Sequence, residues 1–236
     1  MKPIRVLVVH RSAILRRRLT HAFGKDSTIE VAGAVLNAEI ATDRVIKLRP
    51  DVVLLGLDLP GMGAVPFLES LMRKYAVPTV LLGETTDKSN RMTIKALEAG
   101  AVDFVVLPQD APDPGVDTDL IELRTKIKIA ATANLAHFKQ PHAHTVQSEG
   151  LMRPKAVAAS TGRIIAIGAS TGGTDAIRDI LVQFPPAIPG IVVVQHMPAV
   201  FTRMFAQRLN SECIIEVKEA EDGDAVLSGR ALVAPG

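Results

Sequence analysis

The residues that most constrain the fold are 163–179, with the sequence RIIAIGASTGGTDAIRD. Four apolar residues at 164–167 predict a buried strand, the glycine-rich segment 168–173 predicts a tight turn, and an amphipathic helix follows from Thr174. A strand joined to a helix in this way is typical of a parallel α/β sheet. We therefore expect the turn at the carboxyl edge of such a sheet, where open α/β sheets place their sites.

A dinucleotide-binding turn is the first interpretation to test. Gly168 and Gly173 match the outer glycines of the G-x-G-x-x-G pattern, but Ser170 stands where the backbone would have to approach a pyrophosphate. The next apolar strand, 191–195, is followed by His196 rather than by the acidic residue that binds a ribose. Both discriminating positions disfavour a nucleotide site.

The same two positions suit nucleophilic catalysis. Adjacent strands of a βαβ unit lie about 4.8 Å apart, so Ser170 and His196 are expected side by side. An imidazole next to a hydroxyl activates it as a nucleophile, and the free N–H groups of the helix start can bind an oxyanion. The alternatives are that Ser170 caps the helix and His196 is a loop residue, or that the helix start binds a phosphorylated sugar or another anion.

Further motifs follow in a fixed order: PGIVVVQHMP at 189–198, FTRMFA at 201–206, VKEA at 217–220 with DGD at 222–224, and VAPG at 233–236. Together with GASTGG they resemble the methylesterase domain of the CheB-type chemotaxis response regulators. The resemblance implies Ser170 as nucleophile, His196 as its base and Thr171 in a supporting role. It also implies hydrolysis of glutamate methyl esters and deamidation of glutamines on methyl-accepting chemotaxis receptors, without metal or organic cofactor.

In the resembled family, the aspartate that orients the histidine lies further along the chain. We therefore expect residues 163–236 to form the N-terminal part of a catalytic domain that is truncated at its C-terminal side and holds no counterpart of that aspartate. Asp222 and Asp224 flank a glycine between two expected strands, where turn formation accounts for both. The segment is read as an incomplete doubly wound, Rossmann-like parallel sheet, with strands near Ile164, Ile191, Ile214 and Ala231 and helices near 174–183 and 199–210.

Residues 1–138 alternate strands and helices five times, which predicts a flavodoxin-like domain with a five-stranded parallel sheet. The polar stretch 139–162 is read as a linker. The expected strands are 4–9, 29–35, 52–57, 79–82 and 104–107, and the expected helices are 12–24, 38–48, 65–74, 88–99 and 117–138.

This layout, with PDVV at 50–53, LPGM at 59–62, AGAVDF at 99–104 and Pro108, resembles a response-regulator receiver domain. The resemblance implies that the phospho-acceptor aspartate is replaced by Gly56 and the Mg²⁺-binding acidic pair by His10 and Arg11. The switch hydroxyl is replaced by Gly83, and the lysine before the final proline by Leu107.

We therefore expect a degenerate receiver with no phospho-acceptor and no metal. Asp58, in the loop after the third strand and near Arg11, is not expected to replace the acceptor. The alternative function is a non-catalytic pseudo-receiver that acts as a binding module in a signalling array.

The composition of the 236-residue chain disfavours two classes of partner, membranes and nucleic acids. No apolar run is long enough to span a membrane, and no secretory layout is found, so a cytoplasmic protein without membrane insertion is expected. With no Trp, one Tyr and a net charge of +2, nucleic-acid binding is not expected. Cys213 is predicted to be a core residue. His137, His142 and His144 lack the spacing of a specific metal site. Residues 16–18 (RRR) are predicted to form a solvated helix face. The partners implied are the receptors and a chemotaxis histidine kinase.

Overall fold

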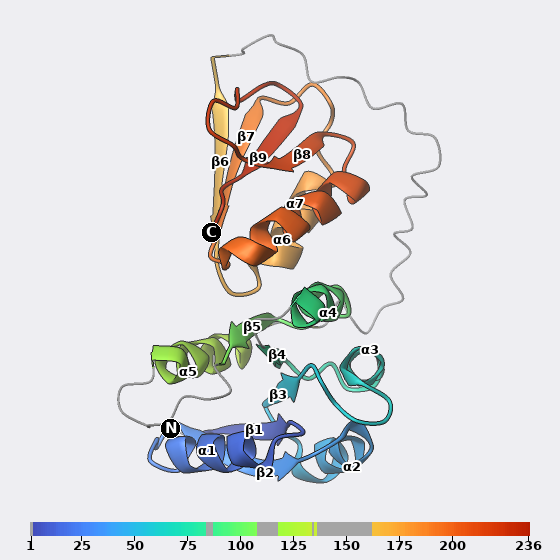
Figure 1. Ribbon diagram of the computed structural model, residues 1–236, viewed down its shortest axis with the longest axis vertical. Helices are drawn as coiled ribbons and strands as arrows, with labels where there is room; N and C mark the ends of the chain where they lie inside the picture. The colour runs from blue at the N-terminus through green and yellow to red at the C-terminus, as the bar shows by residue number, and fades with distance from the viewer. Residues whose placement is uncertain (1, 84–86, 108–117, 134, 136–161) are drawn as a thin grey trace. The chain divides into compact units, whose positions relative to one another are not determined.

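The computed structural model describes residues 2–83, 87–107, 118–133, 135 and 162–236. The chain divides into two compact units, residues 1–142 and residues 143–236. Each unit is an α/β structure built on a parallel sheet (Figure 1). The expected linker, 139–162, lies outside the described residues except for Gly162, so the domain boundaries stay a prediction.

The first unit confirms the expected flavodoxin-like sheet. Its five strands are all parallel and follow the order β2-β1-β3-β4-β5. The elements are β1 (Ile4–Val9), α1 (Ala13–Phe23), β2 (Ile29–Val35), α2 (Ala38–Leu48), β3 (Val52–Gly56), α3 (Ala64–Lys74), β4 (Thr79–Gly83), α4 (Asp87–Glu98), β5 (Asp103–Val106) and α5 (Thr118–Ala130).

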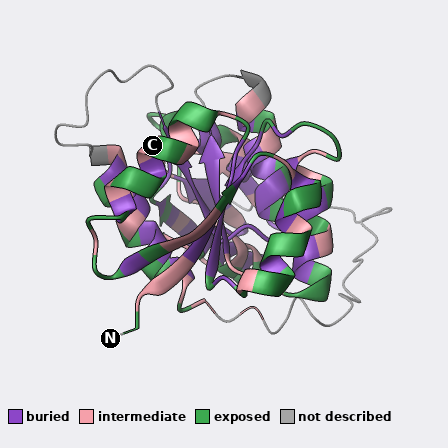
Figure 2. Ribbon diagram, turned by 90° about the horizontal axis from the view of Figure 1, so that it is seen from below, coloured by how far each residue is buried: buried purple, intermediate pink, exposed green. Residues whose placement is uncertain are grey.

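The core of the first unit lies on both faces of the sheet, because β3 consists of apolar residues and β4 is apolar after Thr79. All residues of β3 and β4 are buried. Helices α1 and α5 cover one face, where Phe23 and Ile127 belong to one buried cluster with Val8 and Leu54, and α2, α3 and α4 cover the other (Figure 1). Figure 2 shows the buried residues on the strands and on the inward sides of the helices.

The prediction for the fifth helix, 117–138, is wrong at its C-terminal end, because α5 stops at Ala130. The chain then tightens into i→i+3 turns, with Thr132 N–H donating to Ile129 O and Ala133 N–H donating to Ala130 O. The Thr132 hydroxyl also donates to Ile129 O, at 2.7 Å, and such local side-chain bonds compete with helix continuation. Residues 136–138 lie outside the described part of the chain.

The second unit forms a four-stranded parallel sheet in the order β6-β7-β9-β8. The strand expected near Ile214 begins two residues later, because the buried Ile215 packs into the core before pairing starts. The elements are β6 (Ile164–Ala169), α6 (Gly173–Leu181), β7 (Gly190–Gln195), α7 (Ala199–Glu212), β8 (Glu216–Glu219) and β9 (Arg230–Val233).

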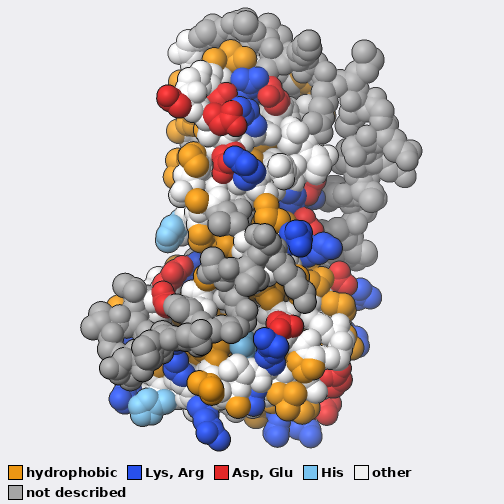
Figure 3. All heavy atoms as spheres, viewed as in Figure 1, with side chains coloured by type: hydrophobic (Ala, Val, Ile, Leu, Met, Phe, Trp, Pro, Cys, Tyr) orange, Lys and Arg blue, Asp and Glu red, His pale blue; other side chains and the backbone are white. Residues whose placement is uncertain are grey.

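Charged side chains of both signs are interspersed over the face shown in Figure 3.

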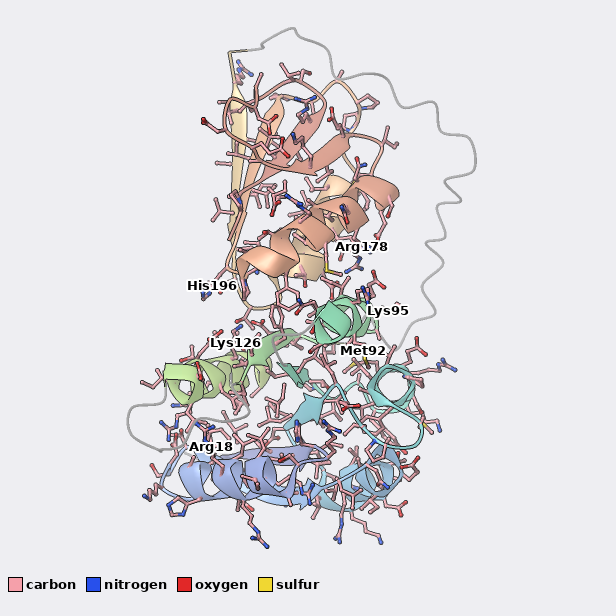
Figure 4. All side chains as sticks on the ribbon, viewed as in Figure 1. Arg18, Met92, Lys95, Lys126, Arg178 and His196 are labelled. Atoms are coloured by element: carbon pink, nitrogen blue, oxygen red, sulfur yellow. The ribbon has the colours of Figure 1, made fainter. Side chains whose placement is uncertain are left out.

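One lysine of the described residues, Lys126, is instead buried. Lys126 on α5 is 7% exposed, and its ammonium group lies 3.0 Å from Asp103 Oδ1 at the start of β5 (Figure 4). It also donates to Phe104 O and contacts the more exposed Glu122. Because Asp103 is itself largely buried, the lysine compensates a charge that has little access to water.

Replacing Lys126 with Met should therefore destabilise the first unit by about 3 kcal/mol, since a buried carboxylate is left without its partner. Glu122→Gln removes the exposed partner of the same lysine and should cost less than about 0.5 kcal/mol. Urea unfolding followed by the fluorescence of Tyr75, the only tyrosine in a chain without tryptophan, reports on this unit. Equal losses in the two variants would contradict the assignment.

Candidate active site

The carboxyl edge of the second sheet holds the two residues expected to form a catalytic pair. Ser170 directly follows β6, and His196 directly follows β7. Strands β6 and β7 are parallel neighbours, with Ala169 opposite Gln195 at the end of the ladder. The ladder continues one step further, because His196 N–H donates to Ala169 O at 3.0 Å. This register places the serine and the histidine next to each other.

The Ser170 Oγ atom lies 3.4 Å from the Nδ1 atom of His196. Both residues are exposed, so a substrate can reach the hydroxyl. Figure 4 shows His196 at the end of the sheet. The separation is slightly longer than a strong hydrogen bond, as is common for catalytic pairs before substrate binds. The expected adjacency of Ser170 and His196 is confirmed, whereas their catalytic roles stay a prediction.

The turn after Ser170 is shaped by two glycines. Gly172 has φ of +75°, a left-handed conformation that favours glycine, and Gly173 begins α6. Gly173 N–H donates to Ser170 O at 2.7 Å, so this group is occupied within the turn. Any oxyanion donor from the turn must therefore be another N–H group. Thr171, half-buried, lies between the serine and the glycines.

Asp222 and Asp224, downstream of His196, belong to a turn, as the sequence predicts. Asp224 Oδ2 accepts a hydrogen bond from Glu221 N–H at 2.7 Å and lies 3.0 Å from Lys218 Nζ. The Glu221 N–H group and the Lys218 ammonium hold the pKa of the Asp224 carboxyl below its ordinary value. In the part of the chain that the structure describes, no carboxylate forms a hydrogen bond with the His196 ring.

At the carboxyl edge of the first sheet, a side chain of the same unit, that of His10, occupies the central position. His10 follows β1 and is 8% exposed. Its Nδ1 atom accepts a hydrogen bond from Ser12 N–H at 3.0 Å, which fixes the ring. A Cβ atom built on Gly56, at the end of β3, would overlap that ring. The His10 ring thus occupies the space that a side chain at position 56 would need.

An ion pair lies at the same edge of the first sheet. Arg11 Nη1 lies 3.0 Å from Asp58 Oδ2, so a cation of the protein stands beside this exposed carboxylate. Arg16 Nη1 donates to His10 O at 2.6 Å and to Arg11 O at 2.9 Å, which holds the loop in place. The prediction of a solvated helix face for residues 16–18 is therefore only partly correct, because Arg16 is half-buried and bonds to the loop.

The structure also shows where most of the other residues singled out from the sequence lie. Leu107 is 5% exposed and packs in the core, and Gly83 ends β4. Cys213 is buried, as expected. Within the described ranges no group of three or more His, Cys, Asp or Glu residues is arranged to bind a metal. His137, His142 and His144 lie outside those ranges. Among the helices that the structure describes, none is long and apolar enough to cross a membrane.

Two structural features were missed by the sequence analysis. One is the position of the His10 ring against Gly56. The other is the buried amide of Gln195, whose Nε2 atom donates to Ser170 O at 2.9 Å. The sequence did contain a signal for the Gln195 amide, because a glutamine at the end of a strand of Ile and Val residues is expected to be buried, and buried polar groups usually form hydrogen bonds.

Comparison with known proteins finds a different family match in each part of the chain. Residues 6–113 match the response regulator receiver domain family, and residues 165–236 match the CheB methylesterase family. The crystal structure of the response regulator domain of Thermotoga maritima CheB resembles the chain with a TM-score of 0.50 and 28% identity, covering 56% of this chain and 98% of that one.

Two relatives with the name protein-glutamate methylesterase/protein-glutamine glutaminase align with almost the whole chain. The protein of Syntrophotalea carbinolica is 46% identical over 100% of this chain, and that of Sulfurimonas denitrificans is 44% identical over 99%. The chain spans 67% of the length of each. By sequence, fold and order of its two parts, the chain belongs to the CheB family of protein-glutamate methylesterase/protein-glutamine glutaminases.

Proposed function

We propose that the chain hydrolyses glutamate methyl esters of methyl-accepting chemotaxis receptors, and deamidates glutamines there, as a cytoplasmic serine hydrolase. The observation that carries the proposal is the 3.4 Å approach of Ser170 Oγ to His196 Nδ1 at an exposed sheet edge. The names of the two relatives support the substrate class, a protein glutamate ester or glutamine.

The proposed reaction follows from the positions of the two side chains. His196 takes the hydroxyl proton as Ser170 Oγ attacks the ester carbonyl carbon, and the imidazolium then protonates the departing methoxide, which leaves as methanol. Water attacks the acyl-enzyme with His196 as base, the carboxylic acid is released and the proton returns to Ser170 Oγ. With a glutamine substrate, ammonia leaves in place of methanol.

The negative charge on the carbonyl oxygen needs donors that are in place before the reaction. Backbone N–H groups of the turn after Ser170 are proposed for this role, apart from that of Gly173, which already donates to Ser170 O. Thr171 follows the nucleophile directly and is proposed to support this turn.

Replacing Ser170 with Ala should abolish methanol release from methyl-labelled receptor membranes, a loss of roughly 10⁴-fold or more, because the acyl acceptor is removed. Ser211→Ala, which removes an exposed hydroxyl of α7 in the same unit, is the matched control and should leave release unchanged. Equal release from both variants would overturn the nucleophile assignment. Absence of release from the folded parent chain would favour the non-catalytic binding module.

For the first unit, we propose a pseudo-receiver that is not phosphorylated. The His10 ring occupies the space of a side chain at Gly56, and Arg11 pairs with Asp58, so acceptor and metal ligands are both replaced by contacts within the protein. A chemotaxis histidine kinase, if it binds this unit, would then act as a docking partner without phosphoryl transfer.

Incubation with acetyl phosphate and Mg²⁺ should leave the intact mass of the chain unchanged, because no carboxylate stands at the end of β3. A phosphorylatable receiver treated in the same tube provides the positive control. A hydroxylamine-labile phosphoryl adduct, which marks an acyl phosphate, on a carboxylate of the first unit would refute the pseudo-receiver proposal.

Gly56→Ala should destabilise the first unit by about 1–3 kcal/mol, because the added methyl group overlaps the His10 ring. In a His10→Ala background the same substitution should cost much less, and the difference is the coupling free energy of a double-mutant cycle. Urea unfolding followed by Tyr75 fluorescence measures it. Additive effects would show that the ring does not restrict position 56.

A further inference from the structure

We infer that Gln195 is a positioning residue that holds Ser170 and His196 at their reactive separation. The inference rests on the proposed function, because it concerns the same serine and histidine. It gives a role to a residue that touches neither the reacting hydroxyl nor the imidazole.

Gln195 is the last residue of β7 and is only 7% exposed. Its neighbours along the strand are apolar, and Val193 on the same side of the strand is fully buried. A buried amide lowers stability by about 1–3 kcal/mol unless it forms hydrogen bonds. A glutamine in this place is therefore expected to have partners that require it.

The amide group bonds to the two residues of the proposed catalytic pair. Its Nε2 atom donates to Ser170 O at 2.9 Å and to His196 O at 3.4 Å. One side chain thus bridges the backbone at the ends of β6 and β7. Ser170 O also accepts the Gly173 N–H bond, so the carbonyl group of the nucleophile is held by two donors.

The other end of the amide fits against the turn. A Cβ atom built on Gly173 would overlap the Oε1 atom of Gln195. This oxygen is buried and has no hydrogen-bond partner among the described residues. Glycine at position 173 therefore makes room for the amide, and turn and side chain fit together as one unit.

The consequence for catalysis is geometric. Ser170 is exposed and follows the last paired residue of β6, so its backbone lies outside the ladder and is held within its own turn by the Gly173 N–H bond. The amide adds a second attachment that runs directly to the strand carrying His196. Misplacement of a reacting group by about 1 Å can lower a rate roughly 100-fold. Loss of the amide should thus reduce turnover more than it reduces substrate binding.

The experiment compares Gln195→Met with Gln183→Met in the full chain, using methanol release from methyl-labelled receptor membranes. Methionine has a similar length and no donor group. Gln183 provides the matched control, because its amide also donates to a backbone carbonyl, Asp179 O, but at the exposed end of α6. We expect kcat to fall about 10- to 100-fold in Gln195→Met with KM within twofold of the parent, and no change in Gln183→Met.

Gln195→Glu serves if the methionine variant does not fold, since it keeps the shape and replaces the donor by an acceptor; it should show the same loss of kcat. Circular dichroism confirms folding in each case. A folded position-195 variant with kcat within threefold of the parent, or with a loss confined to KM, overturns the inference.

Failure of the proposed function is recognised separately, as absence of release from the parent chain together with no effect of Ser170→Ala. In that case, crystal structures of the parent and of the folded position-195 variant decide the positioning role. An increase of about 1 Å in the distance from Ser170 Oγ to His196 Nδ1 supports it, and an unchanged distance overturns it.

Discussion

The parallel pairing of β6 with β7 is the interaction on which the proposed active site depends. In a parallel ladder, residues at the carboxyl ends of both strands emerge at one edge, so two chain segments distant in sequence are brought together without any long-range side-chain recognition. The bond from His196 N–H to Ala169 O extends the ladder past the last residue of β7. A shift of register would separate the hydroxyl from the imidazole.

The carboxyl edges of the two sheets differ in whether a reactive side chain is exposed there. At the end of β6 the hydroxyl of Ser170 is exposed, and the space beside Gly172 is open, whereas the space beside Gly173 holds the Gln195 amide. At the end of β3, Gly56 opens a space that the His10 ring then fills. Glycine at a strand end therefore does not indicate an open site by itself, because the neighbouring strand decides what enters the space.

The framework was predictable from sequence because the central strands are apolar runs bounded by turn residues. The limits of β1, β2 and α2 agree with the expected 4–9, 29–35 and 38–48. The end of α5 was missed because the Ala-rich segment after Ile129 contains no Gly or Pro, the strongest helix breakers, and Thr132 alone is a weak signal. The adjacency of Ser170 and His196 followed from strand pairing alone. The directions of the His10 and Gln195 side chains depend on tertiary packing, which a pattern of residue types does not contain.

The filled edge of the first sheet also limits how the proposed esterase can be regulated. A ligand shifts a conformational equilibrium only by the difference between its affinities for the two states. In a receiver that binds Mg²⁺ and a phosphoryl group, these provide that difference. Here Arg11 beside Asp58 and the ring of His10 are parts of the protein and do not arrive as ligands. Within the proposed function, a change of state in the first unit then requires a binding partner that prefers one state, and the concentration of that partner takes the place of phosphorylation as the signal.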